Sequence, residues 1–457
     1  MTENEKPSHR VHAPLEKPAR VVIDPFVGFI NAQSASGWVL IAATVLAVAV
    51  ANSALGSSYQ NFLHLSFGIE LGSFRFQQSI QHWINDGLMS LFFFLLSLEL
   101  KRELLVGQLS SIRRAGSVVC AAIGGVALPA ALFLMTADSE LVRAGWAMPV
   151  ATDTAFALMI LVLLGDRIPK SVRAFLVGIA IVDDLAAILI IALGYTKDVD
   201  LQWAVPATIA VLTLVALNIT GIRHGLAYFL VGVVLWYQFL NLGLHGTLAG
   251  VTVAVLAPVR PALSREAFLS RIQKRVDSFR RRQFGSTKRI LEDPEQQEIA
   301  AAIQLDAEQA TPALKRWETR LEMPISFIVM PLFAFANAGI ILSPDAFRDL
   351  WASELSVAVP LGLVVGKPIG IFLAVWLGRL AGLVELPSNM SLRHVFGIGM
   401  IAGIGFTMSI FIATLAFGEG TQLLEIAKQC IIFSSLVAAI LGYTWVRVAY
   451  RGTNNND

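Results

Sequence analysis

The most constraining feature of this chain is an apolar run from Ala174 to Leu193 that carries two consecutive aspartates, Asp183 and Asp184, near its centre. A run of this length is enough to span a bilayer as a helix. Even on lenient insertion scales, a charged side chain in the middle of such a helix costs roughly 2.5–3.5 kcal/mol. The aspartates can be purely structural, bonded to neighbouring donors. Ionisable residues at membrane depth usually mark the path of an ion or proton, however, and we expect this pair to serve transport.

The composition places the chain among membrane proteins with many spans. Of its 457 residues 55% are hydrophobic and only 15% are charged, and the mean hydropathy is +0.66. The formal charge of +2 gives no support for a nucleic-acid partner. Cys120 and Cys430 both lie in apolar segments, so we expect no disulfide framework.

Twelve apolar segments of spanning length predict an all-α protein with about twelve transmembrane helices. They lie near residues 36–52, 84–100, 117–136, 145–164, 174–194, 203–220, 224–240, 242–257, 324–342, 355–378, 395–417 and 423–446. The eighth is the least secure, because Asn241 and Pro258 confine it. The predicted organisation is an N-terminal tail (1–30), eight segments (31–257), a long charged loop (258–323), four segments (324–447) and a C-terminal tail (448–457).

Positive charges predict the orientation, because cytoplasmic loops of membrane proteins carry an excess of Lys and Arg. The loops after the first, third, fifth and seventh segments hold at most one such residue each. Basic residues gather instead before the first segment and after the second and fourth: Arg10, Lys17, Arg20, Lys101, Arg102, Arg113, Arg114, Arg167, Lys170 and Arg173. We therefore expect both termini in the cytoplasm.

Two connections differ from the other, short loops. Within residues 53–78, apolar residues occupy every second position from Leu65 to Leu71, and Gly72-Ser73 follows, which predicts a small β-hairpin on the outer face. The exposed edge of such a hairpin needs a partner, and a second protomer can supply one. Residues 258–323 are dense in both signs of charge. We expect there a solvated cytoplasmic loop with some amphipathic helix, with contact to anionic lipid as the alternative.

An inverted repeat is predicted between segments three to five and segments ten to twelve, because the third and tenth cross the membrane in opposite directions. The middle member of each triplet is interrupted. The fourth segment contains Pro149 followed by Thr152 and Asp153, and the eleventh contains a glycine-dense run, 397–407. Such glycines can serve close helix packing alone. Breaks at matching positions of two halves favour a transport site where the broken helices cross.

The predicted breaks also assign chemistry to charged side chains. A helix broken inside the membrane exposes amide and carbonyl ends, which Asp153 and Lys367 are placed to compensate. Consecutive residues on a helix point about 100° apart, so Asp183 and Asp184 cannot perform the same task. One can face a cation while the other meets a fixed charge such as Lys367. Such buried carboxyl groups can hold protons and release them to a cation, and carboxylate and hydroxyl oxygens suit a hard alkali ion.

Several ordered runs resemble those of the NhaA-type sodium/proton antiporters. They are Trp83–Leu88, Leu98–Leu104, Ala151–Leu158, Asp183–Leu185, Pro331–Gly339 and Gly366–Pro368. The match covers almost the whole membrane portion, and the ordered set is far more specific than any single run. This family is itself a known example of inverted repeats with broken helices, so the repeat is not an independent prediction of the fold.

The resemblance implies roles for individual residues. Asp184 would be the principal Na⁺ ligand, supported by Asp183 and Thr152, and Asp183 would pair with Lys367 when Na⁺ is absent. Thr152 and Asp153 would lie where the interrupted segments cross. A cytoplasmic cluster that senses pH in the family corresponds here to Glu99, Arg102, Glu103, Lys315, Arg316 and Glu318. Thr319 and Glu322 stand where family members carry histidines, and the preceding loop is longer, so the pH of activation is expected to differ.

We therefore expect an inner-membrane antiporter that expels Na⁺ or Li⁺ in exchange for external protons. We expect the exchange to be electrogenic and to work by alternating access, and we expect neither enzymatic activity nor a cofactor. The resemblance also implies a homodimer formed through residues 53–78, with lipid around it and no nucleic acid. A sodium-coupled symporter of an organic anion is the alternative. An intramembrane aspartyl protease is disfavoured, because its two aspartates come from separate helices to flank a peptide bond, whereas these are adjacent.

Overall fold

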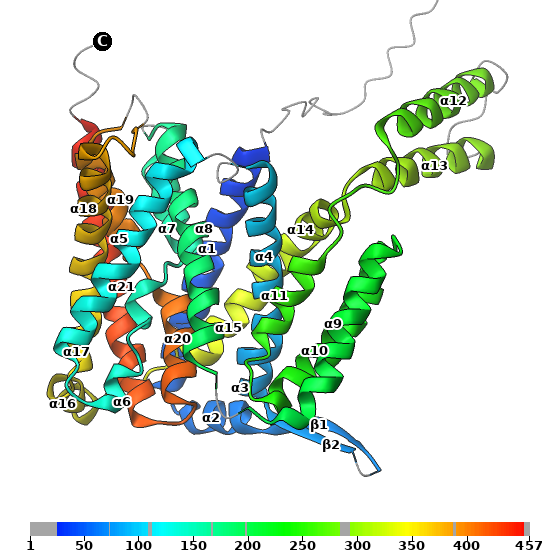
Figure 1. Ribbon diagram of the computed structural model, residues 1–457. Coiled ribbons are helices and arrows are strands. Elements are labelled where there is room, and N and C mark those ends of the chain that lie inside the picture. The colour runs from blue at the N-terminus through cyan, green and yellow to red at the C-terminus, as the bar shows by residue number, and fades with distance from the viewer. Residues whose placement is uncertain are drawn as a thin grey trace, which may run out of the picture.

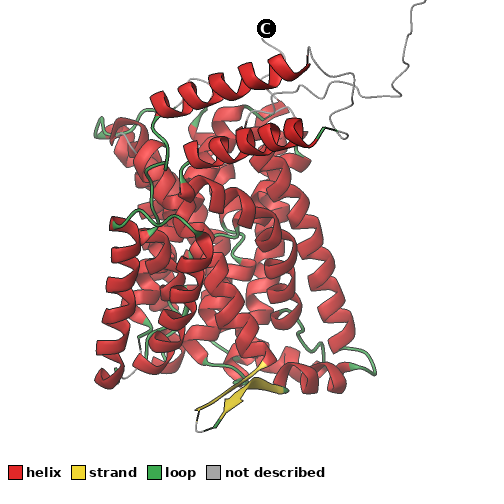
Figure 2. Cartoon of the chain, turned by 90° about the vertical axis from the view of Figure 1, so that its right-hand side faces the viewer, coloured by secondary structure: helices red, strands yellow, loops and turns green. Residues whose placement is uncertain are grey.

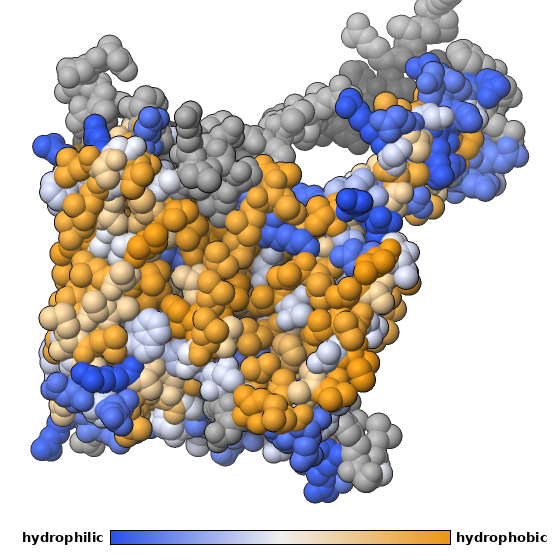
Figure 3. Space-filling view, in the orientation of Figure 1, coloured by the Kyte–Doolittle hydropathy of each residue, from blue (hydrophilic) through white to orange (hydrophobic). Residues whose placement is uncertain are grey.

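The computed structural model describes residues 25–72, 74–107, 112–165, 168–196, 199–283, 293–386 and 390–451. Most of its helices run between the same two ends of one bundle (Figure 1). Hydrophobic side chains cover a broad belt at mid-height on the face that Figure 3 shows, and hydrophilic ones gather at both ends. This distribution is typical of a protein embedded in a bilayer.

Eight helical stretches in the described part of the chain are long and apolar enough to cross a membrane. Their helices are α3 (Ile80–His82) with α4 (Met89–Val106), α5 (Ile112–Thr136), α8 (Lys170–Gly194), α9 (Ala204–Ile219), α10 (Gly225–Leu242), α14 (Ala313–Pro324) with α15 (Met330–Asn337), α17 (Leu355–Pro360) with α18 (Lys367–Leu380), and α21 (Gln422–Arg451). A shorter helix, α16 (Pro344–Ala352), precedes α17.

Three bent pairs of helices raise the number of possible crossings to eleven. They are α1 (Pro25–Ala51) with α2 (Gly56–His64), α6 (Glu140–Arg143) with α7 (Thr154–Leu163), and α19 (Leu392–Ala402) with α20 (Phe406–Phe417), bent by 111°, 44° and 51°. Helix is present in each of the twelve predicted segments. The count of twelve crossings and the inverted repeat stay predictions.

The eighth predicted segment, 242–257, is shorter than expected, because its helix α11 (Thr247–Leu256) has only 10 residues. At 1.5 Å per residue it is about 15 Å long, half the thickness of a bilayer core. Side chains of opposite charge form hydrogen bonds with the backbone at its two ends. Asp86 accepts a hydrogen bond from the Gly246 N–H before α11, and Lys101 Nζ donates to the carbonyl of Ala257 after it, at 2.6 Å. These charges complement the helix dipole, so α11 can end among protein groups.

Prolines alter the helical hydrogen bonding in two spans that approach the site. A π-helical turn follows Pro324, at Ile325–Val329, and another follows Pro360, at Leu361–Gly366. Proline has no N–H to donate, so the regular ladder is interrupted and a wider turn is accommodated. Lys367 comes directly after the second of these turns.

Helices α5 and α18 pack against each other through glycines. A side chain on Gly124 would collide with the backbone carbonyl of Gly370, and one on Gly370 would collide with that of Gly124. Only small residues allow two helix backbones to approach this closely inside a membrane. This contact holds α18, and with it Lys367, against the bundle.

The predicted β-hairpin is confirmed. Strands β1 (Ser66–Leu71) and β2 (Phe74–Ser79) pair antiparallel, with Glu70 opposite Arg75, and Gly72 has a φ of 60° in the turn between them. The ring of Phe76 lies 5.5 Å from that of Trp83, which attaches the hairpin to the bundle. The hairpin lies at the end of the bundle opposite to α12 and α13 (Figures 1 and 2).

The long charged region 258–323 contains two helices of its own, α12 (Arg265–Gln283) and α13 (Pro294–Ala310). They pack against each other, and Arg275 on α12 binds Asp306 on α13 at 2.5 Å. Figure 1 shows the pair projecting from one end of the bundle, the same end at which α1 begins and α21 finishes. Helix α14 starts at Ala313, so the ninth predicted segment begins earlier than expected.

Candidate functional site

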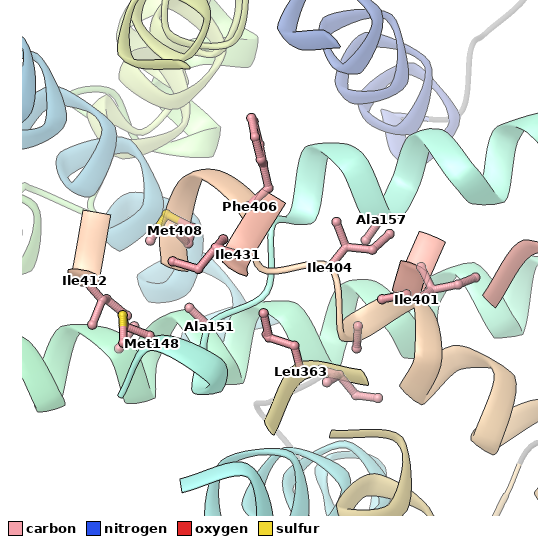
Figure 4. Packing of buried hydrophobic residues seen from close by; sticks show 14 of the residues in the cluster. Met148, Ala151, Ala157, Leu363, Ile401, Ile404, Phe406, Met408, Ile412 and Ile431 are labelled. Carbon is pink, nitrogen blue, oxygen red and sulfur yellow. The ribbon is translucent and has the colours of Figure 1, made fainter. Parts of the chain in front are cut away.

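The breaks between α6 and α7 and between α19 and α20 contact each other at the centre of the bundle. A short 3₁₀ turn, Met148–Val150, ends the first half, and the chain is extended before α7 begins. The N–H of Asp153 donates to the carbonyl of Ile404 at 2.7 Å, and the Thr152 hydroxyl donates to the carbonyl of Ala402 at 2.9 Å. Figure 4 shows the two unwound segments, with Ala151 and Ile404, among packed hydrophobic side chains.

Asp153 stands at the amide ends of two helices at once. One carboxylate oxygen accepts from the N–H of Phe156 in α7 at 3.2 Å. The other accepts from the N–H of Thr407 in α20 at 3.2 Å and from the Thr407 hydroxyl at 2.5 Å. Because a helix N-terminus carries a partial positive charge, this buried carboxylate stabilises both half-helices.

The place where the two breaks contact each other is called the helix crossing below. Lys367 lies at a carbonyl end of this helix crossing. Its ammonium group donates to the carbonyl of Val150, the last residue of the 3₁₀ turn, and lies 2.9 Å from Asp183 Oδ2. The hydroxyl of Thr152 shares its one proton between that same oxygen, at 2.8 Å, and the Ala402 carbonyl. Neither the Lys367 nor the Asp183 side chain has any exposed surface. The structure therefore brings together a buried ion pair, a threonine and two helix ends.

The two consecutive aspartates of α8 have different surroundings. Asp183 faces Lys367 and Thr152, and its second oxygen, Oδ1, has no hydrogen-bond partner among the described residues. Asp184 is only 4% exposed and lines a cavity together with Thr152 and Asp153. The geometry thus separates a carboxylate held by a fixed cation from a carboxylate that faces a cavity.

The cavity at Asp184 leads toward the end of the bundle that bears α12 and α13. Its lining also includes Ser36 in the first half of α1 and Glu99 in the last half of α4, and both helices have those halves at that end (Figure 1). Its polar part is lined by oxygen atoms of carboxylates and hydroxyls. Such oxygen atoms are the ligands that hard alkali cations prefer. In the described part of the chain, no three His, Cys, Asp or Glu side chains gather as a metal site.

Most of the residues matched to a pH-sensing cluster lie together between α4 and α14. Arg102 lies 2.8 Å from Glu103 and 3.3 Å from Glu318, and Lys315 lies 2.7 Å from Glu318. Glu99 interacts electrostatically with Glu318, Arg102 and Lys315 and also lines the Asp184 cavity. Arg316 is different, because among the described residues its side chain forms none of these ion pairs; its buried Nε, like that of Arg102, has no hydrogen-bond partner there.

Three residues of the crossing were missed by the sequence argument: Thr407, Ser409 and Ser435. Ser409 donates to the carbonyl of Met148 at 2.6 Å, and Ser435 on α21 accepts from the N–H of Phe406 at 3.0 Å. Each of these two serines binds a backbone group that the breaks leave without a helical partner, whereas Thr407 binds the Asp153 carboxylate. The available signal was a hydroxyl residue at or just after the end of the glycine-dense run, or inside an apolar helix, and such a residue is common.

Comparison with known proteins gives one consistent result. The family model described as Na⁺/H⁺ antiporter 1 matches residues 27–446. The Na⁺/H⁺ antiporter NhaA of Sulfurimonas denitrificans is 39% identical over 97% of this chain and 100% of its own length. NhaA 1 of Saccharophagus degradans is 39% identical over 94% of this chain and 93% of its own, and NhaA of Koribacter versatilis is 40% identical over 93% and 91%. The crossing, its ion pair and its cavity-facing aspartate therefore occur in a chain that belongs to the NhaA family of Na⁺/H⁺ antiporters.

Proposed function

We propose that this protein expels Na⁺ or Li⁺ in exchange for external protons, electrogenically and by alternating access, with Asp183 and Asp184 as the site at which cation and proton compete. The observation that carries the proposal is the difference between the two aspartates. Asp184 faces a cavity, while Asp183 is bound by Lys367 and Thr152. A cation entering the cavity meets Asp184 first and can then recruit the unpaired oxygen of Asp183 and the oxygen of Thr152.

Competition at this site couples the two fluxes. A carboxylate without a proton or a cation is costly in a poorly solvated place, so the loaded forms are the ones that change conformation. Protonated Asp184 brings a proton in, and Na⁺ bound to Asp184 leaves. An empty site does not cross, and neither ion leaks without the other.

Charge counting explains how the exchange becomes electrogenic. With Asp184 protonated, Asp183 ionised and Lys367 protonated, the site has no net charge. With Na⁺ on two ionised aspartates and Lys367 still protonated, the net charge is again zero, and one proton would exchange for one Na⁺. Two-for-one exchange requires that a second proton leave the site when Na⁺ takes Asp183 from Lys367, whose ammonium group then retains only the Val150 carbonyl. Two protons then exchange for one Na⁺, and one net charge moves in each cycle.

The orientation follows from the basic loops. The end with α12, α13, the start of α1 and the end of α21 is proposed to be cytoplasmic, in the inner membrane of a bacterium. The Asp184 cavity then receives Na⁺ from the cytoplasm. The cluster of Arg102, Glu103, Lys315 and Glu318 is proposed to sense cytoplasmic pH, because it lies beside Glu99 near the same entrance.

The hairpin is proposed to join two protomers on the outer face. Its Phe67 side chain is 65% exposed, and the neighbouring Leu65 is 59% exposed. A two-stranded sheet has an unpaired edge on each strand, and a second copy can pair with one of them. Cross-linking of intact membranes through a cysteine on the hairpin tests this assignment.

Everted membrane vesicles test the transport proposal. Their cytoplasmic face is outside, so a respiratory substrate acidifies the lumen and quenches a permeant amine dye. Adding Na⁺ or Li⁺ should restore the fluorescence with wild-type protein, and K⁺ serves as a comparison ion. Asp184→Asn should abolish the response, whereas the matched control Asp277→Asn on α12 should retain it. Normal Na⁺-dependent dequenching by Asp184→Asn would refute the assignment. The family match does not favour the symporter alternative, which predicts uptake of a labelled organic acid with Na⁺ instead.

A further inference from the structure

A second cavity lies on the hairpin side of the bundle. Its lining includes Gln78 of β2, Asn85, Glu419, and Phe411 and Thr414 of α20. The Asp184 cavity includes Met408, which precedes Phe411 by less than one turn of the same helix. Only about 5 Å of α20 therefore separates the linings of two cavities that lie toward opposite ends of the protein.

Three phenylalanine rings from three helices fill the place between the cavities. Phe411 on α20 lies 5.3 Å from Phe93 on α4 and 6.1 Å from Phe333 on α15, measured between ring centroids. Each side chain is at most 1% exposed. A cation passing between these rings would lose its water without gaining an oxygen ligand, so the cluster is a barrier to ions.

On the hairpin side of the three rings, a chain of hydrogen-bonded polar side chains connects the ends of the same three helices, α15, α4 and α20. Asn337, the last residue of α15, donates to Asn85 Oδ1 at 2.6 Å, and Asn85 Nδ2 donates to Glu419 Oε1 at 2.7 Å. Asn85 lies in the π-helical turn Trp83–Leu88, before α4. Glu419 follows α20 and stands between Gly418 and Gly420, whose φ angles of 78° and 76° favour glycine.

We propose that these six residues form the outer gate of the transporter: Phe93, Phe333, Phe411, Asn85, Asn337 and Glu419. Helix α20 belongs to the crossing, because Thr407 binds Asp153, whereas α4 and α15 line the opposite wall. In the outward-facing state, Asp184 faces the second cavity, on the hairpin side. To reach that state, the helix crossing must move so that Phe411 separates from the other two rings and Glu419 separates from Asn85. The proposal rests on the alternating-access mechanism proposed above.

Reversible cross-linking tests the gate. In a Cys120→Ala/Cys430→Ala background, the variant Asn85→Cys/Glu419→Cys is treated with a short bis-methanethiosulfonate reagent in everted vesicles. Na⁺-dependent dequenching should fall to the fraction of molecules that remain uncross-linked on a gel, and a reductant should restore it. The matched control is Arg275→Cys/Asp306→Cys, which joins α12 to α13 outside the linings of both cavities and should keep its activity after cross-linking.

The outcomes separate the gate from the transport proposal. Full exchange by the cross-linked Asn85→Cys/Glu419→Cys protein would overturn the gate and leave the antiport assignment intact. Absence of Na⁺-dependent exchange in folded wild-type protein would count instead against the proposed function.

A second measurement does not depend on the cysteine variant. Glu419→Ala removes the acceptor of Asn85 and weakens the closed outer gate, so fewer molecules face the cytoplasm. The Na⁺ concentration for half-maximal dequenching should rise roughly three- to tenfold. Glu419→Gln keeps an oxygen acceptor and should rise less. Equal, unchanged half-maximal concentrations in both variants would overturn the role of Glu419 in the gate.

Discussion

Replacing Lys367 by methionine should destabilise the protein strongly. The side chain keeps its length but loses the charge that lies 2.9 Å from Asp183. Asp183 and Lys367 are both fully buried, so water cannot replace the lost partner. Removing one member of a buried ion pair costs about 3–5 kcal/mol in soluble proteins. Thr152 still donates to Asp183, which places the expected loss near the lower end of that range.

The double variant Asp183→Asn/Lys367→Met should recover most of this loss. Neither residue then carries a charge, and the desolvation of two ions is avoided. Replacing both members of a buried pair is often neutral or stabilising by about 1–4 kcal/mol. The loss caused by Lys367→Met alone should also shrink at low pH, because a protonated Asp183 leaves no charge uncompensated.

Thermal unfolding of the purified protein in detergent measures both effects, with Lys428→Met as the matched control. Lys428 is also buried, but its partner Glu425 at 2.8 Å has a side chain that is 42% exposed. Water can solvate Glu425 after the change, so this variant should lose at most about 1 kcal/mol. The reasoning is refuted if Lys367→Met is no less stable than Lys428→Met, or if the double variant is as unstable as the single one.

Three further predictions concern the supports of the site and the projecting helices. Asp153→Ala should lower the unfolding temperature by more than Asp153→Asn, because asparagine keeps an acceptor for the two helix N-termini, each worth about 1 kcal/mol; equal shifts would contradict this role. Lys101→Met should destabilise the protein by about 1–3 kcal/mol by leaving carbonyls at the end of α11 without their charged donor, with Lys101→Arg closer to wild type in the same assay. The hydrogen bond from Arg275, reinforced by Arg271, lowers the pKa of Asp306. The ion pair of Asp306 therefore stabilises the α12–α13 contact fully at any pH above the ordinary pKa of an aspartate. This stabilisation is lost as the pH falls below about 4. Hydrogen exchange in α12 should accelerate at low pH and in Asp306→Asn, and unchanged protection would disprove it.

The membrane segments and the hairpin could be read from local sequence, since each depends on short-range patterns. Long apolar runs locate helices because a bilayer leaves no other way to satisfy the backbone. Alternation from Leu65 to Leu71 followed by Gly72-Ser73 was enough for the hairpin. The segment that contains α11 was harder, because Asp86 and Lys101, which hold its ends, lie more than 140 residues away in sequence.

The contacts of the site could be anticipated only in part. That Asp183 and Asp184 face different surroundings follows from the geometry of one helix. Which of them meets Lys367 depends on how α18 and α8 both pack against α5, and the sequence-based assignment came from family resemblance. Ser435 could not be selected at all, because a serine in an apolar helix most often bonds to its own backbone.

For this protein, local sequence patterns predict two carboxylates at membrane depth and two interrupted helices, because hydropathy, proline and glycine act locally. Only the tertiary structure decided how these features meet. It placed the Asp153 carboxylate on two helix N-termini, Lys367 between Val150 and Asp183, and Asp184 in a cavity. The physical reason is that each buried charge and each broken helix end must find its complement on another segment, and packing alone determines which segment is within reach.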